Sequence, residues 1–482
     1  VLPMLAVHSL IAFSFCAPPL AAALKFLSFN PIVFHSTANH LSRMSDALVE
    51  AGHEVVMLSP ILHSGLPNVS SKHSRIIHIP GNSLMLQFEE IAKKSMSNDL
   101  WTSSQSNPFA YVEMVRSMVP PLNEMCRVTL DTPGLVEQLR EEHFDAAFSE
   151  TTVSLCGFGL FHLLGIDRFA ATTSFASFNA DEHITGVPAF TSFQPALSSL
   201  HGDRMSFFGR VSNLLFHLGW SHAIHVTRQP LQDFFDQRYP RMPRLEDIAK
   251  NSSFFFVNTD PLIDFPQLTS PKMVSIGGIA LPSENHPLEE PLSSLMSARP
   301  RAVLVSFGSV MLSSLMPQAF KETILALARS MPNVTFIWKY EKPEEEIAVG
   351  ISNLFTAKWL PQTDILRDPR LSAFVTHGGA GSAYEAAMSG VPTITVPVMG
   401  DQIRNSEMLR RLGTTRIVER DELATPEPLV NAVREVLEDE RYSRRARRVA
   451  SMVAGQPVSA QERLVRHLEF MARFGPLEQL SH

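Results

Sequence analysis

The chain has 482 residues, of which 45% are hydrophobic and 18% charged, and its formal net charge is -7 at pH 7. This length exceeds what one hydrophobic core usually fills, so two domains are expected. The acidic balance argues against a nucleic-acid partner, which usually needs a basic field, and the apolar fraction excludes a disordered chain.

The first 23 residues form a signal-like apolar segment. Its core includes Leu10-Ile-Ala-Phe-Ser-Phe, and the run Ala21-Ala22-Ala23 resembles a cleavage region. Glycosylation sequons at Asn68, Asn251 and Asn333 agree with a secretory route. No later segment has the roughly 20 continuous apolar residues of a membrane span.

In the first half, strand-like runs alternate with helical patterns. Residues 24–30 and 54–58 predict strands, separated by a loop over 31–37 and a helical pattern over 41–49. Further along, the patterns predict strands at 144–149 and 254–258, a helix over 156–164 and a cleft-covering loop over 186–210. This βαβ order predicts a parallel sheet flanked by helices.

A stretch rich in Pro, Ser and Gly, residues 265–300, suggests an interdomain linker. A second βα series follows it. Its strands are predicted at 302–307, 334–338, 372–376 and 392–396, and its helices at 317–330, 428–437 and 441–453. Two doubly wound domains would bind ligands at the carboxyl ends of their strands, one substrate per domain.

Three cysteines are present, Cys16, Cys126 and Cys156. Loss of the signal-like segment would leave Cys126 and Cys156 as one bridge in an oxidising compartment, or as two buried free thiols. No cysteine pair has zinc-ligand spacing, so no metal site is expected.

A glycine-rich turn follows the strand predicted at 372–376. Gly379 and Gly381 would let backbone N–H groups approach a phosphate at a helix N-terminus, where His377 and Ser382 add donors. Ser309, after the earlier strand at 302–307, belongs to a second, smaller anion-binding turn. Taken alone, such turns often serve only tight packing.

Five polar or aromatic side chains suggest contacts to a nucleotide and a sugar. Trp359 with Gln362 could stack on a base and bond its edge. Glu385, about one turn into the helix, could accept from ribose hydroxyls. Asp401 and Gln402 could form hydrogen bonds with sugar hydroxyls. Each also fits an ordinary half-buried or surface position when taken alone.

Together these positions resemble the donor signature of the UDP-glycosyltransferase family, in particular the invertebrate members of its animal branch. The matching residues are Trp359, Gln362, His377, Gly379, Ser382, Pro397, Asp401 and Gln402. In that family these positions, with Glu385, hold uracil, ribose, diphosphate and donor sugar. One departure is Gly381, where many members carry Asn.

The resemblance covers nearly the whole chain from Leu24 and implies an α/β GT-B fold, with two doubly wound Rossmann-like domains facing a cleft. It implies an acceptor domain at 24–270, a linker at 271–300, a donor domain at 301–455 and a helix crossing back at 456–482. The implied function is inverting transfer of glucose or glucuronate from a UDP-sugar to a hydroxyl of a small lipophilic acceptor. A polymer or a lipid-linked sugar is a further acceptor option.

No cofactor is implied beyond the UDP-sugar co-substrate. The resemblance places the protein in the lumen of the endoplasmic reticulum. Family members usually carry a C-terminal membrane anchor, which this chain, ending at His482, does not include. Homo-oligomers remain an open option.

The family's catalytic base lies in the first strand-to-helix loop, and its carboxylate partner follows a later strand. The carboxylate position falls on Glu150, whereas the base position falls on Thr37. A shifted loop would make His35 the base, which is the preferred reading, and His40 is a second candidate. If neither serves, the chain is a catalytically impaired UDP-sugar-binding homologue.

Overall fold

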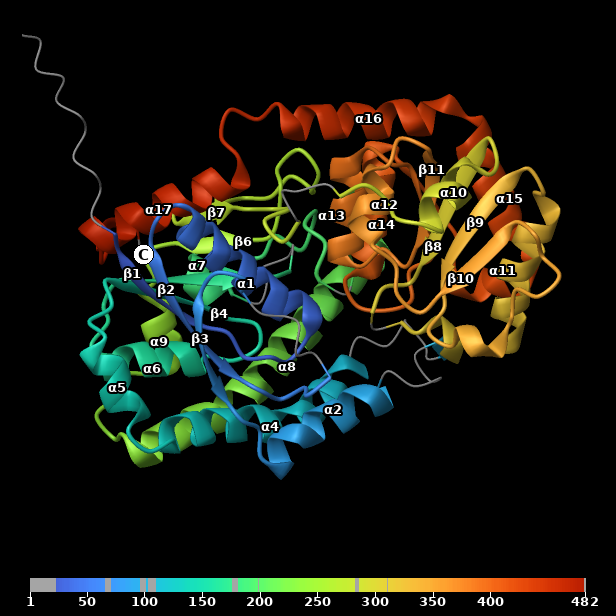
Figure 1. Cartoon of the computed structure of the whole chain (residues 1–482). Coiled ribbons are helices and arrows are strands. Elements are labelled where there is room, and N and C mark those ends of the chain that lie inside the picture. The colour runs from blue at the N-terminus through green and yellow to red at the C-terminus, as the bar shows by residue number, and fades with distance from the viewer. Residues whose placement is uncertain are drawn as a thin grey trace, which may run out of the picture.

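The computed structural model describes residues 23–65, 71–95, 101–102, 110–175, 181–197, 199–281, 286–309 and 311–480. The signal-like segment up to residue 22 and the sequon at Asn68 lie outside the described residues. Two α/β lobes lie side by side, each built on one sheet (Figure 1). Every paired strand in both sheets is parallel.

The first lobe contains a seven-stranded sheet of order β3-β2-β1-β4-β5-β6-β7. Its strands are β1 Lys25–Phe29, β2 Glu54–Pro60, β3 Arg75–Ile79, β4 Ala146–Glu150, β5 Phe169–Thr173, β6 Phe255–Val257 and β7 Met273–Ser275. Its helices are α1 His35–Glu50, α2 Ser83–Ser95, α4 Ala110–Asp131, α5 Leu135–Glu141, α6 Cys156–Leu164, α7 Glu182–Thr185, α8 Phe207–Arg238 and α9 Leu245–Lys250.

Several boundaries differ from the sequence prediction, most clearly at α1, β7 and α8. Helix α1 already begins at His35, inside the predicted loop 31–37. Strand β7 lies inside the predicted linker 271–300, so the first lobe continues past residue 270. Helix α8 begins at Phe207, before the end of the predicted loop 186–210. In each case a short or irregular apolar pattern gave no local signal for the element that tertiary packing completes.

The second lobe contains a six-stranded sheet of order β10-β9-β8-β11-β12-β13. Its strands are β8 Arg301–Ser306, β9 Val334–Lys339, β10 Leu354–Ala357, β11 Leu371–Thr376, β12 Thr393–Thr395 and β13 Thr415–Ile417. Its helices are α10 Leu292–Ser297, α11 Gln318–Ser330, α12 Gln362–Arg367, α13 Ala380–Ser389, α14 Gln402–Leu412, α15 Pro426–Glu438 and α16 Glu440–Ala454. Short 3-10 turns lie at Ser313–Leu315, Pro343–Glu345 and Arg420–Ala424.

Both sheets are buried on both faces, which explains the nearly continuous apolar runs of their strands. In β1, Leu27 and Phe29 enter one core cluster while Phe26 enters another. In β8, Val303 and Leu304 divide in the same way. Side chains that alternate along a strand point to opposite faces of its sheet, so each sheet is covered by helices on both sides.

The last long helix, α17 Ala460–Phe474, returns to the first lobe after α16 spans the top of the molecule (Figure 1). Its Leu464 and Leu468 enter the core cluster that contains Phe26. A 2.9 Å contact joins His53 Nε2 to Glu469 Oε1. The C-terminal residues therefore complete the first lobe.

Buried polar contacts join the two lobes. Arg404 Nη2 of the second lobe lies 2.7 Å from Asp264 Oδ1 of the first, and both side chains are 1% exposed. The Asp260 N–H donates to the Tyr384 hydroxyl over 3.0 Å. Charges this deeply buried are tolerated only when paired, so these contacts fix how the lobes face each other.

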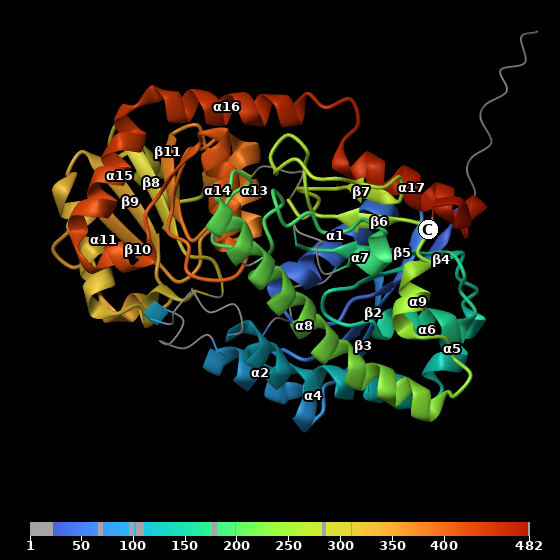
Figure 2. The same ribbon diagram turned by 180° about the vertical axis from the view of Figure 1, so that it is seen from behind.

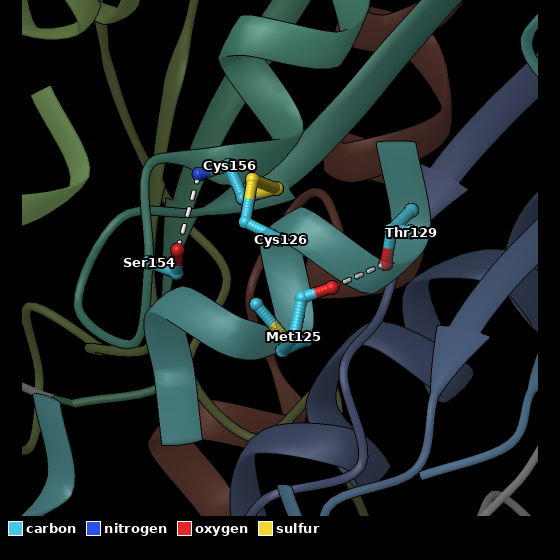
Figure 3. Close-up of a disulfide and its surroundings, with 5 residues drawn as sticks. All are labelled: Met125, Cys126, Thr129, Ser154 and Cys156. Carbon is cyan, nitrogen blue, oxygen red and sulfur yellow. Dashed lines mark hydrogen bonds between the residues drawn. A yellow bond between two sulfur atoms is a disulfide. The ribbon is translucent and has the colours of Figure 1, made fainter. Parts of the chain in front are cut away.

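A disulfide joins Cys126 of α4 to Cys156, the first residue of α6 (Figure 3). The structure thus contains the bridge, not the two free thiols. The Cys156 N–H donates to Ser154 Oγ over 3.1 Å, at the start of the same helix.

None of the helices in the described ranges is long and apolar enough to cross a bilayer.

Candidate functional site

The predicted site residues gather where the parallel strands of the two sheets end. In the second lobe, β8 and β11 are neighbours in the sheet. The chain adds β9 and β10 on one side of this pair and β12 and β13 on the other, so the strand order changes direction between β8 and β11. In the first lobe the same change of direction lies between β1 and β4. Such switch points leave a crevice beyond the carboxyl ends of the strands, where open α/β sheets bind ligands.

The glycine turns after β8 and β11 enclose the His377 ring. A Cβ added to Gly308 would lie 2.7 Å from His377 Cε1, and one added to Gly379 would lie 2.4 Å from Nε2. Gly378 and Gly308 have φ of +80°, a conformation that favours glycine. Burial lowers the pKa of His377 to about 4, with Lys339 adding to the shift. The ring is therefore neutral and can donate one hydrogen bond at the N-terminus of α13.

Trp359 presents its indole to the cleft. It is 66% exposed although it is a large aromatic residue. Lys339 Nζ lies 5.7 Å from the centre of the indole ring, and the His35 ring of the first lobe lies 6.5 Å from it. An exposed indole at an interlobe crevice offers a planar surface on which a base can stack.

Gln362, Ser382 and Glu385 form one hydrogen-bonded group beside this indole. Gln362 Nε2 donates to Ser382 Oγ over 3.0 Å and to Glu385 Oε2 over 2.5 Å. Thr363 donates to the other Glu385 oxygen over 2.9 Å. Burial raises the pKa of Glu385. The group holds acceptor and donor atoms in fixed positions, as recognition of vicinal hydroxyls requires.

Gln402 begins α14 and Asp401 is its N-cap residue, next to the glycine turn. Gln402 Oε1 accepts from the N–H groups of Val398 and Met399 over 2.8 and 3.0 Å, so this oxygen shapes the loop after β12. Asn405 donates to Asp401 Oδ2 over 2.7 Å and to Gly378 O over 3.1 Å. Burial raises the pKa of Asp401.

In the first lobe, Glu150 at the end of β4 is bonded to Ser174 after β5. Its Oε1 accepts from the Ser174 N–H over 3.1 Å and from the Ser174 hydroxyl over 2.9 Å. Thr37 Oγ1 lies 3.4 Å from the same hydroxyl. Burial raises the pKa of Glu150 to about 7, and within the described residues its buried Oε2 has no hydrogen-bond partner.

The two histidines considered as bases have different surroundings. His40 is 1% exposed, and its Nε2 lies 2.9 Å from Thr172 Oγ1, so it is a buried core residue. His35, the first residue of α1, is half-buried and faces Trp359. Although the structure describes both side chains, it shows no hydrogen bond between His35 and Glu150. The expected pairing of this imidazole with this carboxylate is therefore absent from this arrangement.

Three further residues of the site did not emerge from the sequence. Lys339 ends β9 and donates to Gly308 O over 2.8 Å, so its ammonium lies beside the glycine turn after β8. Ser174 and Asn405 position Glu150 and Asp401. The position of Lys339 at a strand end was a usable signal, whereas Ser174 and Asn405 carry no local signature.

A family model described as UDP-glucoronosyl and UDP-glucosyl transferase matches residues 29–477. The chain belongs to this family. As a UDP-glycosyltransferase it is a UDP-sugar-dependent enzyme, and its fold is GT-B. Within the described ranges, no three His, Cys, Asp or Glu side chains gather in a way that could hold a metal ion.

Relatives of this UDP-glycosyltransferase are found in animals. The chain is 30% identical over 465 residues to ugt-48 of Caenorhabditis elegans, whose name assigns it provisionally to the UDP-glucuronosyltransferases; the match covers 95% of this chain and 88% of that protein. It is 28% identical over 351 residues to UDP-glucuronosyltransferase 1A4 of Oryctolagus cuniculus; the match covers 72% of this chain and 64% of that protein.

Solved glycosyltransferases share the architecture at low identity. VinC in complex with DTDP is 16% identical with a TM-score of 0.61, covering 94% of this chain and 100% of that one. The calicheamicin glycosyltransferase CalG4 is 17% identical with a TM-score of 0.60, covering 93% and 98%. These matches show the GT-B fold.

Proposed function

We propose that this UDP-glycosyltransferase transfers glucose or glucuronate from its UDP-sugar, with inversion at the anomeric carbon, to a hydroxyl of a small lipophilic acceptor. The carrying observation is the exposed Trp359 indole, faced by Lys339 of its own lobe and by His35 of the other. This arrangement supports a nucleotide platform on one lobe and a candidate base on the other, facing each other.

On the donor side, the uracil stacks on Trp359 and bonds to Gln362, and the ribose hydroxyls bond to Glu385. The diphosphate lies at the α13 N-terminus. There the glycine turn supplies backbone N–H donors, Ser309 and Ser382 supply hydroxyl donors, and His377 supplies an imidazole N–H. Asp401 and Gln402 face the sugar. The proposal needs no metal and no cofactor besides the UDP-sugar.

On the acceptor side, His35 removes the proton. Burial lowers its pKa, which keeps the imidazole neutral and able to accept a proton near neutral pH. The acceptor hydroxyl gives its proton to the His35 ring, and its oxygen attacks the anomeric carbon. The bond from that carbon to the diphosphate oxygen breaks, and UDP leaves with the bonding electrons.

Glu150 does not orient His35 in this arrangement, because no hydrogen bond joins the two side chains; Oε1 of the carboxylate is bonded to Ser174 instead. A second candidate function therefore deserves a test: a UDP-sugar-binding homologue without efficient turnover. It is favoured by Thr37, which occupies the expected base position and contacts Ser174.

Measuring UDP release separates the two functions. The wild type, His35→Ala and Glu150→Gln are each incubated with UDP-glucose or UDP-glucuronate and a panel of phenols, and UDP affinity is measured by calorimetry. We expect turnover in the wild type, none in His35→Ala, and equal UDP affinity in all three. No turnover above blank in the wild type, with intact UDP binding, would establish the binding homologue instead.

We also propose that the protein resides in the lumen of the endoplasmic reticulum. The Cys126–Cys156 bridge supports an oxidising compartment. A family-type C-terminal anchor would attach the full-length protein to the membrane. Titration of free thiols in protein taken directly from cells tests the compartment, since a cytosolic protein would show both cysteines reduced.

A further inference from the structure

The first half of α8 carries a row of large apolar side chains on the surface of the molecule. Six of them are exposed, with exposed fractions of 42% to 80%. They are Phe207, Phe208, Val211, Leu214, Leu215 and Leu218, which together define the α8 outer face. Soluble proteins rarely expose so many neighbouring apolar groups without a partner.

The row is one face of an amphipathic helix. The spacing 207, 211, 214, 215 and 218 repeats every three or four residues, so these side chains project from one side over about three turns. Figure 2 shows α8 in front of the molecule, crossing obliquely from the second lobe to the base of the first. No other labelled element covers its first half in that view.

Buried contacts fix which face points outward. Asn213, on the opposite side of α8, accepts from the Ala196 N–H over 2.9 Å and donates to Thr191 O and Gln194 O over 2.8 and 2.9 Å. Phe216 is buried on the same side. Since these contacts prevent rotation about the helix axis, the apolar row cannot turn inward.

The charges around the outer face are basic. Arg204 and Arg210 are exposed beside it, and the sequence contains no Asp or Glu between Asp203 and Asp233. Two carboxylates close to this segment are paired with basic side chains: Asp203 lies 2.9 Å from Arg411, and Glu182 lies 3.3 Å from His217. An apolar face with a basic border matches an acyl layer covered by anionic headgroups.

We propose that the α8 outer face docks this lobe on the surface of an anionic membrane, lying in the plane of the interface without spanning it. The apolar side chains enter the boundary between headgroups and acyl chains, and Arg204 and Arg210 contact headgroup phosphates. A second copy of the chain is a poorer occupant, because identical basic borders would face each other across a two-fold contact.

A local fluorescent probe tests the docking directly. Leu215→Cys in a Cys16→Ser background is labelled with an environment-sensitive dye and mixed with phosphatidylcholine–phosphatidylserine vesicles. We expect the emission to rise at least about twofold and shift to the blue as the dye enters the apolar boundary. The matched control is Val349→Cys in the same background, since Val349 is 72% exposed on the other lobe; its dye should not respond.

Vesicle flotation supplies the second arm. Phe207→Ser combined with Leu214→Ser and Leu218→Ser should lower partitioning at least about tenfold. Arg204→Gln with Arg210→Gln should reduce binding to anionic vesicles more than to neutral ones. The two cysteine variants, the triple serine variant and the double glutamine variant should all keep the wild-type thermal midpoint and UDP affinity, since the altered side chains are exposed.

Two results would overturn the proposal. One is an equal dye response, or none, at positions 215 and 349. The other is a vesicle-free dimer, seen by light scattering, that the triple serine variant converts to monomers while wild-type protein ignores vesicles.

Discussion

The glycine at position 379 is the sharpest test of the donor site. Its φ of −59° suits alanine, so a substitution acts only through its new methyl group. That carbon would lie 2.4 Å from His377 Nε2, whereas ordinary contacts lie at 3.4–4 Å. The imidazole would have to move by about 1 Å.

The ring also lies close to the other glycine turn, because a Cβ built on Gly308 would be 2.7 Å from His377 Cε1. Displacing a catalytic-site group by about 1 Å can cost about 10²-fold, and overpacking a buried site costs about 1–3 kcal/mol. We expect Gly379→Ala to lower kcat/KM for the UDP-sugar about 10²-fold and to weaken UDP binding at least about tenfold.

Gly381→Ala is the matched comparison in the same helix. No atom lies within 4 Å of a Cβ placed there, and alanine favours helix by up to about 1 kcal/mol. Its loss of kcat/KM should be at least about tenfold smaller than that of Gly379→Ala. UDP-release kinetics measure kcat/KM, calorimetry measures UDP affinity, and thermal melts measure stability. The reasoning fails if Gly379→Ala stays within about threefold of wild type, or if both variants lose activity equally.

Further predictions concern the base, the platform and the bridge. Trp359→Ala should raise the Kd for UDP about 5- to 150-fold, because base stacking contributes about 1–3 kcal/mol; unchanged affinity in calorimetry contradicts this. Since burial lowers the pKa of His35 from its ordinary 6.5, the acid limb of kcat/KM should lie below pH 6.5 and reflect its protonation; a limb near pH 7 that Glu150→Gln abolishes would instead assign the base to Glu150. Because burial raises the pKa of Glu150 from 4.5 to about 7, its contribution to stability is present below pH 4.5 and lost as pH rises to about 7. Glu150→Gln should therefore raise the thermal midpoint at about pH 8 but not near pH 4.5, and an equal shift at both would refute this sign. Replacing Cys126 and Cys156 by serine should lower the free energy of unfolding by about 3–4 kcal/mol, given a sequence separation of 30; denaturant titration of the two proteins checks it.

Much of the fold followed from local patterns. The helix predicted over 156–164 has those bounds in the structure, and the strands at 334–338 and 372–376 differ from β9 and β11 by one residue at an end. These segments are buried on both faces of a sheet or end in clear glycine signals. The short strand β7 and the beginning of α1 were missed, because three residues or one helical turn carry too little periodicity.

The catalytic base is the part of the site that local sequence patterns could not assign. Counting along the sequence placed Thr37 at the base position and left His35 and His40 as alternatives. Packing decides between their environments: His40 faces the core beside Thr172, and His35 faces the other lobe. Residue order alone contains neither fact.

The sequence by itself determined two lobes with parallel sheets and a donor signature in the second, because hydrophobic period, glycine turns and strand ends are properties of neighbouring residues. Only the tertiary structure decided that Cys126 meets Cys156, that Glu150 bonds to Ser174, and that Trp359 faces His35 across the cleft. It also decided which side of α8 lies outside. Each of these depends on the docking of elements far apart in the chain, and that docking is set by the packing of the whole core rather than by any short stretch of residues.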